Sequence, residues 1–174
     1  MSDDRFERKV PEGDSLDRLV CRDCGFINYE NPKLIVGVVP MWEDKVLLCT
    51  RAIEPRKGYW TVPAGFMELG ETPPEGAARE AMEEANADVE VGSLIGLYTV
   101  RHISQVHMFY RGTLRSTDMS PGAESLELKL FAWEDIPWDE LAFPTIKWAL
   151  RDYEKLRGLE EVVPVVRNTM PRVD

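Results

Sequence analysis

Residues 65–87 read GFMELGETPPEGAAREAMEEANA, a stretch that predicts a loop followed by one helix. Thr72 is a typical helix N-cap, a proline follows at the first helical position, and Glu75 stands where a capping box places its acid. Alanines supply high helix propensity along the next turns. Asn86 tolerates the left-handed conformation found after helix ends. We therefore predict that Glu71–Ala87 is helical.

Three glutamates of this predicted helix share one face. Glu80, Glu83 and Glu84 stand at positions i, i+3 and i+4, which are neighbours on a helix surface. Their mutual repulsion raises their pKa values or destabilises the helix unless a cation offsets it. Mg²⁺ and Mn²⁺ prefer carboxylate and water oxygens as ligands. The pattern indicates a divalent metal site, with a solvated acidic helix face as the alternative.

The residues around these glutamates complete a longer pattern. With Gly65, Glu71 and Arg79, the stretch resembles the Nudix box, G-x5-E-x7-R-E-U-x-E-E-x-G-U, in which U is a bulky aliphatic residue. A chance match of the six fixed positions has a probability of about 10⁻⁶ per starting position. The chain departs from the family at Asn86, where Gly is usual, and at two alanines that replace larger aliphatic residues.

The resemblance implies a metal-binding role for part of the box. Glu80 and Glu84 are then the main ligands of Mg²⁺ or Mn²⁺, and Glu83 is an additional or water-mediated ligand. Gly65 lets the backbone approach the metal and the phosphate closely. The site so formed binds a metal that bridges an acidic protein and an anionic substrate.

Arg79 and Glu71 have a structural role in the same resemblance. Arg79 pairs with a box carboxylate such as Glu83 or Glu71 and orients it. Glu71 is either an anchor or a remote metal ligand, and we favour the anchor. The two residues are therefore expected to maintain the geometry of the site.

The reaction implied by the box is attack of a metal-activated water on a phosphorus of a nucleoside diphosphate derivative. A general base is also needed. In relatives it is a box glutamate, here Glu80, Glu83 or Glu84, or a glutamate from another loop. The loop before a predicted strand offers Glu124 and Glu127, for which a solvated turn acid is the alternative.

Several residues outside the glutamate cluster are candidates for contact with the substrate. Arg51, at the end of a predicted strand, is expected to meet phosphates. Trp60 and Phe66 flank the start of the box, where an aromatic ring can stack on a base or flavin. Core packing is the alternative for Trp60. His102 and His107 have either a place near the substrate or a structural or surface role.

The N-terminal segment contains half of a zinc knuckle, Cys21-x2-Cys24. A tetrahedral zinc site needs two more ligands. From about Val10 to Trp138 the chain resembles the FAD/ADP-ribose pyrophosphatase branch of the family, in which a zinc ribbon with two cysteine pairs precedes the catalytic domain. The first pair, expected just before Val10, is missing. We expect no bound Zn²⁺, because only one cysteine pair is present.

We therefore predict a Nudix pyrophosphatase that acts on ADP-ribose, FAD or both. The alternatives are hydrolysis of a modified nucleoside triphosphate, NADH or a dinucleoside polyphosphate, and a non-catalytic Nudix module that senses a nucleotide. The box retains every carboxylate, which favours an enzyme. The Ser-Gln-Pro-Trp-Pro-Phe-like stretch typical of NADH pyrophosphatases is absent after the box.

The remaining pattern predicts an α/β fold. Apolar runs and a second amphipathic segment favour a mixed β-sheet packed between helices, which the resemblance specifies as a Nudix α/β/α sandwich with a short ribbon-like N-terminal segment. We divide the chain into an N-terminal segment (1–32), a Nudix domain (33–160) and a C-terminal tail (161–174). The expected strands lie at 34–40, 45–50, 60–63, 89–91, 94–100, 105–114 and 127–133, and the second helix at about 144–156.

Composition narrows the partners of the protein. The net charge of -10 disfavours general nucleic-acid binding, because the field repels phosphate. No apolar run is long enough to span a membrane, and the first residues lack the apolar core of a signal peptide. Three cysteines do not suggest a disulfide framework, so we expect a cytoplasmic enzyme. The expected partner is a small nucleotide diphosphate, and a homodimer remains open.

Overall fold

The computed structural model describes residues 5–159 and 161–168. The chain divides into two compact units, Met1–Pro32 and Lys33–Asp174. The smaller unit contains one antiparallel sheet in the order β1-β2-β3. Its strands are short because turns at two positive-φ glycines, Gly13 and Gly25, separate them. The strands are β1 (Phe6–Lys9), β2 (Arg18–Cys21) and β3 (Ile27–Asn28).

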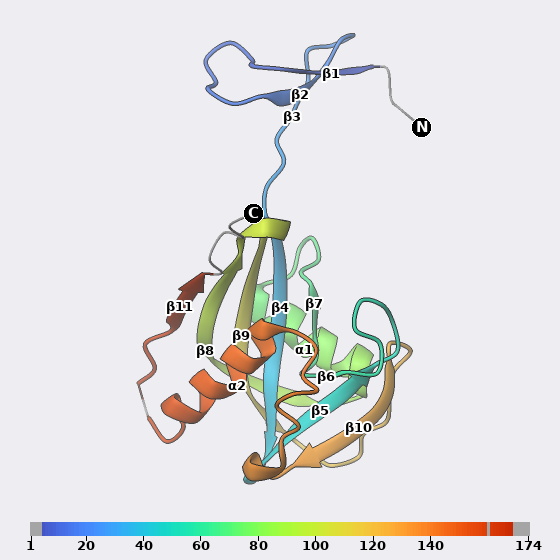
Figure 1. The fold of residues 1–174 in the computed structure, drawn as a ribbon, viewed down its shortest axis with the longest axis vertical. Helices are drawn as coiled ribbons and strands as arrows, with labels where there is room; N and C mark the ends of the chain where they lie inside the picture. Colours follow the sequence, from blue (N-terminus) through green and yellow to red (C-terminus); the bar gives the residue numbers. More distant parts are fainter. Residues whose placement is uncertain (1–4, 160, 169–174) are drawn as a thin grey trace. The chain divides into compact units, whose positions relative to one another are not determined.

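The larger unit is built on one mixed sheet with the strand order β10-β5-β4-β9-β8-β11 (Figure 1). Two pairs, β4 with β9 and β11 with β8, are parallel, and the other neighbours on this path are antiparallel. Two short strands, β6 and β7, pair with β5 and β4. The strands are β4 (Lys33–Trp42), β5 (Lys45–Arg51), β6 (Trp60–Thr61), β7 (Ala64–Phe66), β8 (Val89–Val100), β9 (Gln105–Leu114), β10 (Ser125–Phe131) and β11 (Val165–Asn168).

The two helices of this unit, α1 (Pro73–Ala85) and α2 (Pro144–Leu156), lie on opposite faces of the sheet (Figure 1). Each face has its own hydrophobic cluster. One packs α2 residues such as Ile146 against Tyr98 and Phe109, and the other packs alanines of α1 against Val36 and Tyr110. The predicted α/β/α sandwich with a mixed sheet is confirmed.

Helix α1 has the cap residues that the sequence predicts, although the helix itself is Pro73–Ala85 and therefore shorter than the predicted Glu71–Ala87. The backbone N and Oγ1 of Thr72 each donate to Glu75 Oε2 at 2.7 Å, so the capping box is present. Asn86 ends the helix in the left-handed conformation, with φ of 46°. The small Ala81 and Ala87 are fully buried, so the helix packs closely on the sheet where the family has larger side chains.

Several elements differ from the predicted ones, including the short strands β1, β2, β3 and β7, for which no strand was expected. The two strands expected at 89–91 and 94–100 form a single strand, β8, in which a register shift accommodates the polar break. The strand expected at 127–133 begins at Ser125 and ends at Phe131, because a 3₁₀ turn, η2 (Trp133–Asp135), follows. The segment expected as a tail contains β11, which extends the sheet beside β8.

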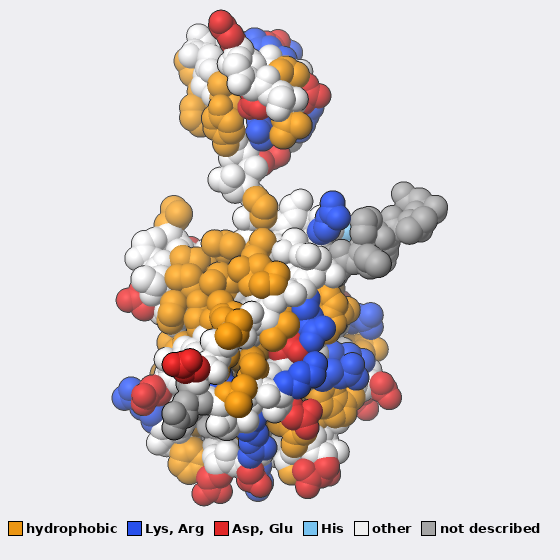
Figure 2. All heavy atoms as spheres, turned by 90° about the vertical axis from the view of Figure 1, so that its left-hand side faces the viewer, with side chains coloured by type: hydrophobic (Ala, Val, Ile, Leu, Met, Phe, Trp, Pro, Cys, Tyr) orange, Lys and Arg blue, Asp and Glu red, His pale blue; other side chains and the backbone are white. Residues whose placement is uncertain are grey.

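The surface of the larger unit has a broad area of hydrophobic side chains on the side that Figure 2 presents, with charged side chains gathered mainly below it. Hydrophobic side chains gathered on a protein surface often mark a contact surface. Within residues 5–159 and 161–168, no helix has the length and apolar character needed to cross a membrane.

Candidate active site

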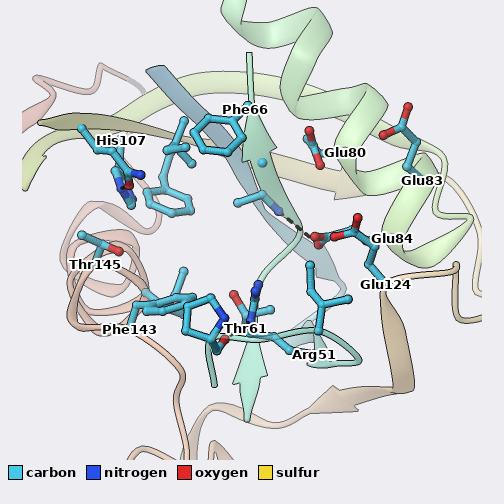
Figure 3. A pocket seen from close by; sticks show the side chains of 18 of the residues that line it. Arg51, Thr61, Phe66, Glu80, Glu83, Glu84, His107, Glu124, Phe143 and Thr145 are labelled. Carbon is cyan, nitrogen blue, oxygen red and sulfur yellow. Dashed lines mark hydrogen bonds between the residues drawn. The ribbon is translucent and has the colours of Figure 1, made fainter. Parts of the chain in front are cut away.

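A pocket of about 620 Å³ opens in the larger unit. It lies beside β7, the strand in which the Gly65–Ala87 stretch begins. The glutamates of α1 line one side of it, and Phe66 and Phe143 lie between them and the opposite side (Figure 3). The lining comes from both helices, several strands and the loop before β10. The tertiary structure thus gathers the predicted site residues around one cavity.

The carboxylates of Glu80 and Glu84 are buried, with exposed fractions of 8% and 7%. Burial raises the pKa of Glu84 to about 8, and the charge of Glu80 contributes to the rise. A hydrogen bond from Ala64 N at 3.2 Å acts in the opposite direction and lowers this pKa. Burial also raises the pKa of Glu80, partly offset by Arg79. Two buried carboxylates on adjacent turns are costly as they stand, and a bound cation would relieve that cost.

Glu83 differs from its two neighbours because it is exposed and points away from the pocket floor (Figure 3). Within the described part of the chain, no group of three or more His, Cys, Asp or Glu side chains is arranged to hold a metal ion by itself. A metal at this place would therefore rest mainly on Glu80 and Glu84, with water or substrate oxygens completing the shell, as Mg²⁺ commonly does.

Two glycines allow close approaches at the site. A Cβ at Gly65 would overlap the carboxylate of Glu80, so a larger residue there would displace that carboxylate from its present position. A Cβ at Gly122 would overlap the main-chain carbonyl of Glu83, and Gly122 N donates to Glu84 O at 2.9 Å. These contacts hold β7 and the loop before β10 against α1.

Arg79 connects the box residues. It donates to both oxygens of Glu71, at 3.0 and 2.9 Å, to Glu80 Oε1 at 2.8 Å and to Glu83 Oε2 at 3.0 Å. Its Nη2 also donates to the main-chain oxygen of Phe66 at 3.0 Å. The hydrogen bonds from Arg79, with one from the amide of Glu68, lower the pKa of Glu71 to about 2. Arg79 thus pairs with Glu71 and Glu83, and the role of Glu71 as an anchor stays a proposal.

The two loop glutamates have different places. Glu124 lines the pocket, and its charge contributes to the raised pKa values of Glu80 and Glu84. Glu127 is exposed on β10 opposite Thr50 and does not line the pocket, because a register shift after Ser125 separates it from the loop. We therefore leave Glu127 out of the site.

Of the three residues expected to contact substrate, two line the pocket. Arg51 donates to Pro55 O at 2.9 Å and lies over the ring of Phe143 at 5.2 Å. Phe66 is 50% exposed at the rim. Trp60 instead packs in the core, edge to face with Phe131 at 4.9 Å, so the core-packing alternative describes it and we withdraw the substrate contact.

Sequence reasoning missed several pocket residues, because they come from segments far from the box. Phe143 and Thr145 lie at the start of α2, and Gln105 and His107 lie on β9. Only His107 was considered, with a structural role as the alternative. The side-chain types give no local signal, and the fold alone places them together.

In the smaller unit, Cys21 and Cys24 are unpaired, and they border a small hollow with Arg5, Phe6, Asp23 and Phe26. Hydrogen bonds from the main chain of Cys24 and Asp23 lower the pKa of Cys21. Residues 1–32 contain no further Cys or His, so two ligands of a tetrahedral zinc site are missing from this chain.

Comparisons with known proteins agree with this geometry. A family model described as NUDIX domain matches residues 31–151, and one described as Nudix N-terminal, a zinc-ribbon model, matches residues 4–30. A Nudix hydrolase of Nitrosomonas europaea has a solved structure that is 48% identical, with a TM-score of 0.89 over 94% of this chain and 93% of that one.

Two curated relatives differ in their described activities. An ADP-ribose pyrophosphatase of Methanocaldococcus jannaschii is 38% identical over 75% of this chain and 78% of that protein. An NAD-capped RNA hydrolase of Photobacterium profundum is 30% identical over 66% of this chain, which spans only 42% of that longer protein.

The family match, together with a helix that bears two buried carboxylates, one of which (Glu80) is bound by Arg79, identifies an enzyme that hydrolyses phosphoric anhydrides. The chain belongs to the Nudix hydrolase family. Within the family it combines the catalytic domain with the N-terminal zinc-ribbon segment and is similar to an ADP-ribose pyrophosphatase.

Proposed function

We propose that the protein hydrolyses the diphosphate bond of a nucleoside diphosphate derivative, ADP-ribose in the first place, with Mg²⁺ or Mn²⁺ held by Glu80 and Glu84. The observation that supports this most directly is the pair of buried carboxylates in one pocket, which fits a hard cation. The similar ADP-ribose pyrophosphatase supports the choice of substrate.

The bound metal would neutralise the diphosphate and activate the attacking water. The protein's own residues then have separate tasks. Arg79 holds the carboxylates in position through its hydrogen bonds to Glu71, Glu80 and Glu83. Gly65 leaves room for Glu80 against β7.

Glu124 is our proposed general base. It is exposed at the pocket edge, close enough to the metal carboxylates for its charge to affect their pKa values. It takes the proton of the water that attacks phosphorus, while the bond from phosphorus to the bridging oxygen breaks. Arg51, which also lines the pocket, is our proposed ligand of the non-bridging oxygens of the substrate.

The test is a substrate panel with Mg²⁺, Mn²⁺ or EDTA, with products identified by mass. ADP-ribose should give AMP and ribose 5-phosphate only when metal is present. FAD, NADH, modified nucleoside triphosphates and dinucleoside polyphosphates form the other arms. If the protein cleaves one of these compounds and not ADP-ribose, the proposed substrate is wrong, but the proposed hydrolysis of a diphosphate bond still holds.

A Glu84→Gln variant distinguishes an enzyme from a nucleotide-sensing module. Glu84→Gln should lose more than about 100-fold of the turnover and remain folded, because loss of a group that only orients a ligand already costs up to about 100-fold. Glu90→Gln, exposed on β8, is the matched control and should keep full turnover. Tight binding of a nucleotide without turnover by the parent protein would support the module instead.

Two further expectations stay proposals. We propose that the hydrophobic area of the larger unit (Figure 2) contacts a second copy of the chain, which light scattering of the purified protein tests. We also propose that Cys21 and Cys24 hold no zinc, because this chain supplies only two of four ligands. Elemental analysis that finds one zinc per chain would contradict the second proposal.

A further inference from the structure

Two buried polar atoms of the pocket have no partner among the described residues, His107 Nδ1 and Thr145 Oγ1. Thr145 is only 3% exposed. Buried polar atoms without partners are rare, and a ligand or an ordered water in the pocket would supply the missing hydrogen bonds. Both residues lie on the side of the pocket away from Glu80, Glu83 and Glu84 (Figure 3). They are thus distant from the proposed chemistry but within the same cavity.

The hydrogen-bonding character of the two atoms follows from their surroundings. His107 Nε2 lies 3.0 Å from Gln105 Oε1, and a carbonyl oxygen can only accept, so Nε2 donates. Nδ1 then carries the free lone pair of a neutral ring. Burial supports the neutral form, because it lowers the pKa of His107 to about 4. The pocket wall therefore offers one acceptor, Nδ1, and one hydroxyl that donates or accepts.

The rest of the lining favours a flat aromatic ligand. Phe66 and Phe143 border the space between the two polar atoms and the glutamates (Figure 3). The lining also includes Ile35, Val100, Phe109 and Ile146, which make this end apolar. A few polar atoms in an apolar, aromatic pocket are what fixes the orientation of a heterocycle.

We propose that His107 and Thr145 bind the edge of a heteroaromatic ring that has an N–H donor beside an acceptor. The N–H donates to His107 Nδ1, and Thr145 Oγ1 donates to the ring acceptor. This inference rests on the proposed function and extends it, because it places the diphosphate at the glutamates and the ring at the far end. The adenine of a nucleotide and the flavin of FAD both have such an edge.

The test measures binding of AMP and of FMN separately by calorimetry, so that it does not depend on turnover. For the ring that is bound, Thr145→Val and His107→Phe should each weaken binding about tenfold, the usual effect of one lost hydrogen bond. Thr61→Val is the matched control. Thr61 also lines the pocket and is buried, but its hydroxyl already donates to Val62 O at 3.0 Å, so this variant should bind as the parent does.

A second measurement keeps the proposal testable if a variant fails to fold. N6,N6-dimethyl-AMP lacks the N–H donor and should bind the parent protein about tenfold more weakly than AMP, if adenine is the bound ring. For a flavin, N3-methyl-FMN serves the same purpose. Weaker binding of the methylated form of either ring supports the proposal and shows whether adenine or flavin is the bound ring. Equal binding by the parent, Thr145→Val and His107→Phe would overturn it, as would no binding of either probe.

The substrate panel separates this inference from the proposed function. If both variants hydrolyse ADP-ribose with an unchanged KM, the proposed hydrolase activity stands and the proposed ring site is wrong. Nucleotide binding that depends on His107 and Thr145, without hydrolysis of any substrate, would keep the ring site and remove the proposed activity.

Discussion

Arg79 and Glu71, eight residues apart, form a two-bond pair in which Nε and Nη2 of the guanidinium donate to the two carboxylate oxygens at 3.0 and 2.9 Å. The second Arg79 terminal nitrogen, Nη1, reaches Glu80 and Glu83 at the same time. One planar side chain therefore ties the loop before α1 to the face of the helix that bears Glu80 and Glu83. Lysine, with a single nitrogen, cannot repeat this arrangement.

Arg79→Lys should lower kcat by about 10–100-fold, because residues that orient metal ligands have effects of this size. Steady-state kinetics at saturating Mg²⁺ measure it. Arg115→Lys is the matched control, since the guanidinium of Arg115 lies in exposed, long ion pairs with Asp88 and Glu90 at 3.7 and 3.9 Å. Equal kcat for the parent and Arg79→Lys would show that the pair does not support catalysis.

Mg²⁺ or Mn²⁺ should raise the melting temperature of the parent protein, because a ligand that binds only the folded state stabilises it. At a concentration 100 times the dissociation constant the gain is about 2.7 kcal/mol. Thermal melts with metal and with EDTA measure the shift. The double variant Glu80→Gln/Glu84→Gln should show no shift, and in EDTA it should melt above the parent, since two costly buried carboxylates are gone. The same metal shift in both proteins would place the metal elsewhere.

His107 should make stability depend on pH. Burial lowers its pKa from 6.5 to about 4 in the folded protein. Between these pH values the unfolded chain binds the proton and the folded protein does not, so the unfolding free energy decreases as pH falls. His107→Phe lacks this loss. Urea unfolding at pH 7.5 and pH 5 should therefore show the parent losing stability relative to the variant. A difference between the two proteins that is constant with pH would contradict the neutral buried ring.

Asp152 should be the anchor of the C-terminal strand. It is fully buried and accepts from Tyr98 Oη at 3.2 Å and from Arg167 Nε at 2.7 Å, with a second bond from Arg167 Nη2. Arg167→Ala leaves a buried carboxylate without its main partner, which typically costs about 3–5 kcal/mol. Chemical unfolding measures the loss. Val166→Ala, at a position 68% exposed on the same strand, should change stability by less than about 0.5 kcal/mol.

The start and end of α1 were predictable because they depend on nearby residues. Thr72 and Glu75 cap the helix three residues apart, and Asn86 ends it through its own backbone preference. The shared face of Glu80, Glu83 and Glu84 follows from the helical repeat alone. The burial of two of them and the exposure of the third do not, because that depends on what packs over the helix.

Other features depend on residues distant in the chain. Trp60 is an aromatic residue beside the box and was therefore a candidate for stacking on the substrate. In the structure it packs against Phe131 of β10 in the core. Strand β11 lacks a local period and forms because β8 offers a free edge and Asp152 offers a partner for Arg167. Glu124 and Glu127 are three residues apart, and the register shift in β10 decides which of them reaches the pocket.

The sequence by itself therefore determined the family, the helix that bears the carboxylates and the class of bond that is cleaved, because each rests on spacing within one short segment. The tertiary structure alone decided which carboxylates are buried and which loop glutamate joins them. It also brought His107 of β9 and Thr145 of α2 into one pocket. Burial and cavity shape arise from contacts between segments that are distant in the chain, such as the hydrogen bond from Ala64 N to Glu84 across 20 residues, and no local pattern encodes them.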